Sequence, residues 1–359
     1  MSELRVNAIR HTGASSDAVT LATDGTCTAK ITNNLSNRNL IINGAMQCAQ
    51  YGGTSGSSGF KAIDRWRMDA TGASAAITQS QHALTSSDTG PWEKGFRYSY
   101  HLLNAGQDGA DVGDFLYVRQ PIEAQNIATS GWDYTSASSY ITLSFWIRSS
   151  VAQNFYGYIQ TIDGTNYSYV WETGSLSANT WTKITKTIPG NSNLVCNTDN
   201  GHGLDLMIVR AFDGTDRTAS MSLNTWAAYS GSSRTPDQTS TFWTTAGATL
   251  EVTGVQLEVG DVATDFEHRS YGDELARCQR YYWQNLKNTY LFQYGETHKR
   301  IEIYFPVPMR TTPTYDHSGG SITIDSGTHQ SEEFFCAYSA SDYDGPGRNY
   351  SEVKFNAEL

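Results

Sequence analysis

Alternation of apolar and polar residues at strand spacing is the feature that most constrains this sequence. Residues 140–149, YITLSFWIRS, carry an apolar side chain at every second position: Ile141, Leu143, Phe145 and Ile147. This period of two is typical of a half-buried β-strand. Residues 204–212, LDLMIVRAF, are apolar at both parities, which predicts a strand in the middle of a sandwich. Because such stretches recur without helical stretches between them, we predict an all-β fold of two packed antiparallel sheets.

Composition and charge agree with this fold and exclude two classes of function. Hydrophobic residues make up 38% of the 359 residues and charged residues 17%, with 21 Tyr and 9 Trp, a mixture that favours strands and polar turns. The formal net charge of −11, without a local Lys/Arg cluster, argues against nucleic-acid binding, since phosphate contacts need a basic face. The first residues lack the apolar run of a signal peptide, and no stretch approaches the ~18 apolar residues of a membrane span. We therefore expect no membrane insertion, and synthesis and folding in a cytoplasm.

No group of residues indicates catalysis. The sequence contains no HExxH, no GxSxG and no phosphate-binding glycine loop, and its eight histidines are dispersed. The five cysteines form no CxxC pair, so we predict neither a zinc site nor a disulfide framework, but reduced packing residues: Cys27, Cys48, Cys196, Cys278 and Cys336. We predict that the protein is not an enzyme.

A long bent strand is predicted over residues 248–259. Leu250 and Val252 share one parity, whereas the apolar residues that follow take the other. The change falls at Gly254, where a β-bulge would place both sets on the same face. This strand would close a sandwich that we assign to residues 41–270, beginning with an apolar strand in NLIINGAMQ, residues 39–47.

The two ends of the sequence differ from this central region. Residues 1–40 are polar and should need a partner to become ordered, so we predict an attachment or oligomerisation segment. After the sandwich, Ser270 can cap a helix with Asp273 and Glu274 in its first turn, and we predict a linker helix over residues 271–286. Residues 287–359 would form a small β domain, whose first strand, in RIEIYFPVPM, carries two prolines that suit an edge strand.

The small C-terminal domain predicts oligomerisation. A unit of this size gains little stability from its own core, and association is the usual remedy without disulfides or metals. Three residues of the linker helix fall on one face at helical spacing and are our candidates for a threefold interface: Leu275, Cys278 and Tyr282. We therefore expect a homotrimer.

Several stretches resemble bacteriophage tail-fibre and related virion proteins. They are RNLIINGAMQ…DRW, LSFWIRSS and, above all, VTGVQLEVGDVATDFEHRSYGDELARCQRYYW followed by FPVPMRTTPT, spanning residues from about 38 to 315. The resemblance implies a carbohydrate-binding jelly roll in the centre and a trimeric C-terminal tip. The start, SELRVNAIRHTG, is similar to N-terminal attachment segments of such fibres, which implies that residues 1–40 join other tail or head proteins of the virion.

Aromatic residues are the candidates for binding sugar. Five of them alternate on neighbouring strand segments: Tyr156, Tyr158, Tyr167, Tyr169 and Trp171. A sixth candidate, Trp146, projects from the polar parity of its strand. Rings on one sheet face can stack on sugars of a host-surface polysaccharide. The alternative is that these rings form core or subunit contacts, which generally take up large aromatic side chains.

A calcium ion is a further possibility, because jelly-roll modules of this kind include some that hold one. The stretch NTDNGHGLD offers hard oxygen donors in Asp199, Asn200 and Asp205, although its spacing does not match an EF-hand loop. The other reading is that no cofactor is bound.

Three functions follow from these observations. The first, which we favour, is a non-enzymatic structural protein of the virion, a short trimeric tail fibre or appendage that contacts host-surface glycans. The second is a purely architectural component, such as a head-decorating or tail-joining protein without a receptor. The third is a tailspike that depolymerises a glycan, which would need paired carboxylates in a groove, typically on a longer β-helical scaffold; the sequence offers neither that length nor a short solenoid repeat.

Overall fold

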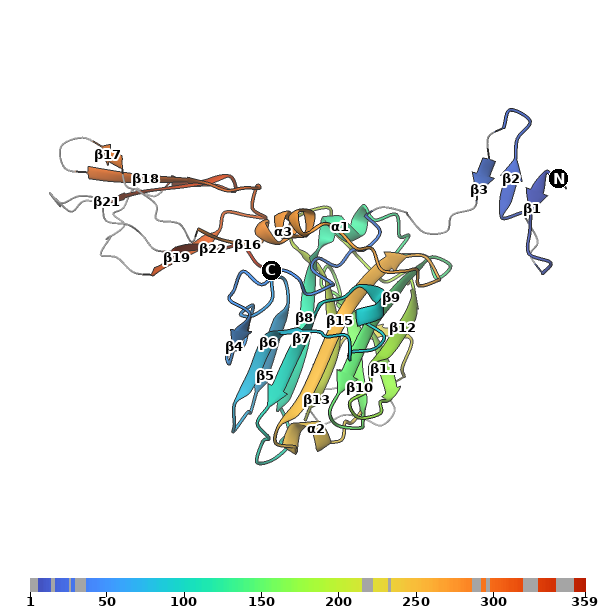
Figure 1. Ribbon diagram of the computed structural model, residues 1–359, viewed down its shortest axis with the longest axis horizontal. Helices are drawn as coiled ribbons and strands as arrows, with labels where there is room; N and C mark the ends of the chain where they lie inside the picture. Colours follow the sequence, from blue (N-terminus) through green and yellow to red (C-terminus); the bar gives the residue numbers. More distant parts are fainter. Residues whose placement is uncertain are drawn as a thin grey trace.

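The computed structural model describes residues 6–13, 17–25, 27–29, 37–214, 222–231, 234–285, 292–294, 298–318, 329–339 and 352–359. These residues form antiparallel sheets with a few short helices, so the predicted all-β class and antiparallel sandwich are confirmed (Figure 1). None of the helices described is long and apolar enough to cross a membrane.

Two six-stranded sheets form the sandwich. Sheet I has the order β12 (Thr182–Pro189), β9 (Tyr140–Ser149), β15 (Ala248–Val259), β7 (Tyr98–Asn104), β6 (Ile77–Ala83) and β4 (Thr54–Ser55). Sheet II has the order β14 (Trp226–Ala228), β11 (Tyr167–Ser175), β10 (Asn154–Thr161), β13 (His202–Asp213), β8 (Phe115–Glu123) and β5 (Arg67–Thr71). Short helical turns lie in the connections: η1 (Trp92–Lys94), α1 (Ala124–Ala128) and α2 (Thr241–Thr244).

The core lies between the two sheets, as the alternation predicts. Ile141, Leu143, Phe145 and Ile147 of β9 are all fully buried, and each such side chain stabilises the fold by about 1.5–3 kcal/mol. Strand β13 lies between β10 and β8 and is buried along nearly its whole length, which explains its apolar sequence. Four of the five cysteines are buried, whereas Cys27 is exposed, so it is not the packing residue that we predicted.

Strand β15 has the bulge that was predicted at Gly254. Its pairing with β9 shifts between Thr253 and Gln256, and Gly254 has a φ of 63°. As a result, Leu250 and Val255 are both fully buried although they lie at opposite parities. A β-carbon at Gly254 would lie 2.6 Å from the Phe96 ring, so glycine is required there for space as well as for backbone conformation.

Residues 39–47 do not form the predicted strand. They are an irregular loop in which Asn43 and Met46 have φ near 60°. The Asn43 side chain donates to the carbonyl oxygens of Cys48 and Asp64 and accepts from the Cys48 N–H, and these local bonds replace strand pairing. The loop packs against the bulge of β15, where the Gly44 carbonyl oxygen accepts from the Val255 N–H at 3.0 Å. A side chain at Gly44 has no room, because its β-carbon would lie 2.1 Å from the Val255 oxygen.

The linker helix is shorter than predicted. Helix α3 spans Tyr271–Gln279, and the Ser270 hydroxyl accepts from the Asp273 N–H, as the predicted cap requires. Residues Tyr282–Asn285 form strand β16 instead of continuing the helix. The Tyr282 ring stacks on Tyr51 with centroids 3.7 Å apart, and this contact with the sandwich favours the extended backbone over a further helical turn.

The C-terminal module contains two small sheets. One has the order β16, β22 (Glu352–Asn356) and β19 (Thr314–Ser318), and the other β17 (Phe292–Tyr294), β18 (His298–Tyr304), β21 (Phe334–Ser339) and β20 (His329–Gln330). Strand β18 lies between β17 and β21, so our edge-strand prediction is wrong; its prolines, Pro306 and Pro308, follow the strand and leave its ladder intact. Six buried apolar residues form the described core: Ile303, Met309, Phe335, Val353, Phe355 and Ala357.

The N-terminal segment contributes a separate small sheet. Strands β1 (Ala8–Ile9), β2 (Val19–Leu21) and β3 (Cys27–Ala29) pair antiparallel, and they lie apart from the sandwich in Figure 1. The segment enters the sandwich at the end where α3 and the C-terminal module lie. Both chain ends therefore meet the sandwich at the same end.

Candidate functional site

Strand β8 places two aromatic rings side by side on the outer face of sheet II. Leu116 and Val118 point into the core, so Phe115, Tyr117 and Arg119 lie on the outer face, where they are half-buried. The Phe115 and Tyr117 rings stack with centroids 5.2 Å apart and planes 21° apart. We call this pair the aromatic platform. A half-exposed pair of stacked rings offers a flat apolar surface to a ligand.

A buried arginine supports the platform from strand β13. Arg210 is 1% exposed, and its guanidinium carbon lies 4.7 Å from the Tyr117 ring centroid and 5.8 Å from that of Phe115. Its Nη1 donates to the Tyr158 hydroxyl at 3.2 Å, and its Nε lies 2.8 Å from the Asp213 carboxylate. Cation–π contact and a buried ion pair fix the rings in position before any ligand arrives.

Four charged residues run beside the platform. Arg67 donates two hydrogen bonds to Asp69, at 2.7 and 2.8 Å. Arg119 lies 3.6 Å from Asp69 and donates to Asp205 at 2.5 Å. We call these four residues the charged row. Arg67 and Asp69 pair across β5 and β8 with Arg119 and Tyr117, so the row and the platform share one face.

The Tyr117 hydroxyl remains protonated at neutral pH. Burial, reinforced by the Asp69 carboxylate, raises the pKa of this phenol above its usual value of 10. A neutral phenol can both donate and accept a hydrogen bond. The face thus combines a flat apolar surface, one hydroxyl and a row of oriented guanidinium and carboxylate groups.

The predicted aromatic residues do not form a single face. Tyr156 and Tyr158 share the outer face of sheet II with Arg210, but Tyr158 is 2% exposed. Three others have the opposite parity and point into the sandwich: Tyr167, Tyr169 and Trp171. Trp171 is fully buried, and Tyr169 packs edge-to-face on Trp226. They are core contacts, the alternative given above.

Trp146 lies on the other sheet, away from the aromatic platform. It projects from the outer face of sheet I, where it faces Lys183 and Thr253 on the neighbouring strands. The loop at Gly90 packs on its ring, since a β-carbon there would lie 2.8 Å from the indole. The aromatic residues at alternate positions of FLYVR, residues 115–119, were the sequence signal that could have identified the platform instead.

The three candidate calcium ligands have different partners. Asp199 accepts from the Gly201 N–H within its own turn, and Asp205 belongs to the charged row. Asn200 contacts the C-terminal module, donating to the Arg310 carbonyl oxygen and accepting from its guanidinium. Nowhere in the described part of the chain do three His, Cys, Asp or Glu side chains converge in a way that could hold a metal ion.

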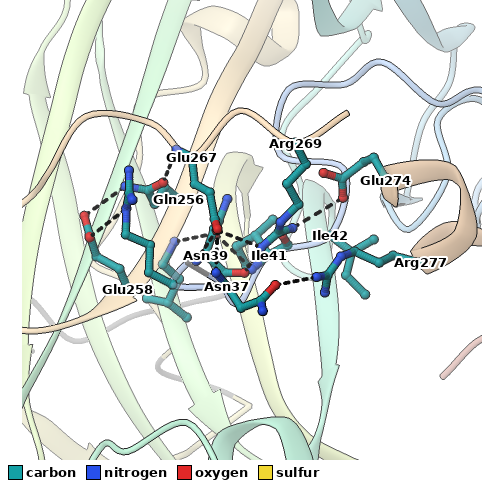
Figure 2. Close-up of polar contacts among 12 residues, drawn as sticks. Asn37, Asn39, Ile41, Ile42, Gln256, Glu258, Glu267, Arg269, Glu274 and Arg277 are labelled. Atoms are coloured by element: carbon teal, nitrogen blue, oxygen red, sulfur yellow. Dashed lines mark hydrogen bonds and ion pairs between the residues drawn. The ribbon is translucent and has the colours of Figure 1, made fainter. Parts of the chain in front are cut away.

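A second polar arrangement fastens residues 37–41 to the segment before α3 (Figure 2). Glu267 accepts from the Asn37 N–H at 2.6 Å and from the Asn39 N–H at 2.9 Å. Arg269 donates to the Asn39 carbonyl oxygen and, at 3.1 Å, to that of Ile41. The two side chains thus form hydrogen bonds with the N–H and carbonyl groups of alternate residues, as a neighbouring strand would. We call this arrangement the clasp.

Helix α3 contributes two more bonds to the same stretch. Arg277 donates to the Asn37 side-chain oxygen at 2.7 Å, and Glu274 accepts from the Asn43 N–H at 2.6 Å. Burial alone would raise the pKa of Glu267, but the Asn39 N–H and the Arg269 guanidinium hold it below its usual value. The clasp is therefore charged at neutral pH and ties the incoming N-terminal chain to the helix that leads into the C-terminal module.

The C-terminal module is docked on the sandwich through Glu123, at the end of β8. This fully buried carboxylate accepts from Arg280 Nε at 2.8 Å and Nη2 at 2.9 Å, from the Tyr281 hydroxyl at 2.5 Å and from Gln125 at 2.6 Å. Its pKa lies below its usual value because these hydrogen bonds outweigh the effect of burial. One buried acceptor therefore holds the first residues of the module.

The last residues of the chain return to the same junction. Arg65 of the sandwich pairs with Glu358 and stacks on the Tyr281 ring at 3.4 Å. Arg310 donates to the carbonyl oxygens of Asn200, Ala357 and Glu358. The module is thus attached to the sandwich at both its beginning and its end.

The candidate residues for a threefold interface lie in this junction. Cys278 is fully buried and Tyr282 is 3% exposed, both through contacts within the chain, which leaves Leu275 as the partly exposed member. An interface built on all three would require the junction to open. Helical spacing placed these residues on one face, but helix α3 ends at Gln279 and Tyr282 belongs to strand β16.

No protein-family model matches the chain, and no curated protein is similar to it in sequence. Among solved structures, the enzymatically active domain of tailspike protein 4 from bacteriophage CBA120 is 12% identical with a TM-score of 0.31; the match covers 62% of this chain and 21% of that one. A putative sugar binding protein from Bacteroides thetaiotaomicron is 14% identical with a TM-score of 0.32, covering 62% and 99% of the two chains. A family 11 carbohydrate-binding module from Clostridium thermocellum is 10% identical with a TM-score of 0.27, covering 61% and 98%.

Proposed function

We propose that this protein is a non-enzymatic structural protein of a bacteriophage virion, a short trimeric tail fibre or appendage that contacts a host-surface glycan. The observation that carries glycan contact is the aromatic platform beside the charged row. Sugar rings stack on aromatic faces through their C–H groups, and their hydroxyls form hydrogen bonds with oriented guanidinium and carboxylate groups. Because Arg210 holds the two rings in place, such a site needs little rearrangement on binding.

The arrangement of the modules supports an appendage. The clasp ties the N-terminal entry to α3, and Glu123 and Arg65 hold the C-terminal module at both of its ends. The attachment segment and the tip are therefore fastened to each other at one end of the sandwich. The short length of the module supports a trimer, in which three chains would share apolar surface.

The titratable groups favour binding over catalysis. A glycosidase needs a protonated carboxylic acid beside a second carboxylate. Burial raises the pKa of Asp64 to about 6, but its carboxylate accepts from the Gln50 backbone and side-chain amides and does not belong to the charged row. On the platform face, Asp69 and Asp205 are both paired with arginine.

Binding to cells tests the proposal. The double variant Phe115→Ala/Tyr117→Ala should lose binding to host cells, while Lys183→Ala, exposed on sheet I, should bind as the wild type does. Equal binding by all three proteins would refute the platform as the site. If the double variant instead changes the mass measured by light scattering, the platform is a subunit contact and the architectural function is the correct one.

Two further measurements test the remaining parts of the proposal. Light scattering should give three times the chain mass of 39.5 kDa, and a monomer mass would contradict the trimer. Incubation with host polysaccharide should yield no shorter products. Their appearance would establish the depolymerase instead.

A further inference from the structure

We infer that the ligand of the platform is a neutral glycan, recognised through its hydroxyls, and that Asp69 is the residue that excludes acidic glycans. This inference rests on the proposed function. It follows from how the charges on this face compensate one another. A face that bound an anionic sugar would present a guanidinium free of a carboxylate partner.

The positive and negative charges that a ligand can reach on this face are equal in number. The charged row contains two arginines and two aspartates, and Asp69 lies between both arginines. The side chains of Arg67 and Arg119 are 33% and 19% exposed, whereas that of Asp69 is 13% exposed. The cations that a ligand can reach are thus already paired.

The charges behind the platform are paired as well, and Arg210 and Arg234 both lie against Asp213. Their side chains are 1% and 16% exposed, so the second arginine that Asp213 holds is less exposed than either arginine of the charged row. With a formal net charge of −11 on the whole chain, long-range attraction for a polyanion is absent as well.

Paired guanidinium and carboxylate groups of this kind can form hydrogen bonds with sugar hydroxyls. A sugar hydroxyl can accept from a guanidinium N–H and donate to a carboxylate oxygen at the same time, which a carboxylate ligand cannot do. A ring stacked on Tyr117 would present its edge to Asp69, the residue opposite Tyr117 on β5. Neighbouring hydroxyls on that edge could then bridge Asp69 and Arg119 without breaking either ion pair.

The substitution Asp69→Asn tests this inference. It keeps the size and one acceptor oxygen but leaves Arg67 uncompensated and Arg119 paired with Asp205 alone. The probes are surface polysaccharides extracted from a strain whose cells the wild type binds, separated by anion exchange into neutral and acidic fractions. Asp133→Asn, an exposed aspartate in the loop before β9, is the control with the same change of net charge.

The expected result has three parts. The wild type and Asp133→Asn bind the neutral fraction independently of salt, and Asp69→Asn gains binding to the acidic fraction by about tenfold at low salt, lost again at high salt. Wild-type binding to the acidic fraction, or no gain by Asp69→Asn, overturns this inference but leaves glycan binding in place. Wild-type binding to neither fraction overturns the proposed function and this inference with it.

Discussion

Replacing Glu123 by glutamine should detach the C-terminal module from the sandwich. The wild-type carboxylate is fully buried and accepts a two-pronged bond from Arg280 and one from the Tyr281 hydroxyl. Breaking a buried ion pair by neutralising one partner costs about 3–5 kcal/mol. Because the Arg280 side chain is 32% exposed, water offsets part of this loss. We therefore expect the free energy of unfolding to fall by about 2–3 kcal/mol at pH 7.

The pH dependence distinguishes loss of the charge from a packing defect. The folded-state pKa of Glu123 is depressed below its usual 4.5, so its stabilisation is present above that value and is lost as the pH falls through the folded-state pKa. Denaturant unfolding should thus show a large difference between wild type and Glu123→Gln at pH 7 and a small one in strong acid. Hydrogen exchange should quicken in α3 and β16. The exposed control Glu93→Gln should change stability by less than about 0.5 kcal/mol. A loss below about 1 kcal/mol at pH 7, or one equal at both pH values, would refute this account of the junction.

Three further substitutions test the clasp, a buried acid and the bulge. Arg269→Ala leaves the Asn39 carbonyl oxygen without its donor and should lower the free energy of unfolding by about 1–3 kcal/mol. Hydrogen exchange should become faster around residues 37–43, and unchanged exchange there would contradict the clasp. Burial raises the pKa of Asp64 from 3.8 to about 6, so the wild type should lose up to about 3 kcal/mol relative to Asp64→Asn as the pH rises from 4 to 6. A difference that stays constant in unfolding titrations would show that the folded-state pKa is not raised. Gly254→Ala forces a β-carbon against Phe96 at positive φ and should lower the free energy of unfolding by about 1–3 kcal/mol; a neutral effect in thermal melts would show that the bulge tolerates side chains.

Local patterns predicted those elements whose determinants lie close together in the sequence. The alternation in β9 and the parity change at Gly254 each depend on a few consecutive residues, and both are confirmed. The Ser270 cap is likewise set by a residue three positions away. In these cases, local preference and tertiary packing favour the same structure.

The loop at residues 39–47 shows why other predictions failed. Its apolar residues resemble a strand, but the backbone is fixed by Glu267, Arg269 and the bulge of β15, all more than two hundred residues away along the chain. Alternation in β11 gave no information on which side faces the core, because Tyr167, Tyr169 and Trp171 would suit either a core or a binding face. The support that Arg210 gives to Tyr117 also depends on strand order, which the sequence does not reveal.

A crystal structure of the protein with a bound neutral oligosaccharide from its host surface is the most direct test of the central claim. We predict a sugar ring stacked on Tyr117, with hydroxyls in contact with Asp69 and Arg119. A sugar on the outer face of sheet I, near Trp146, or on the C-terminal module would contradict the account.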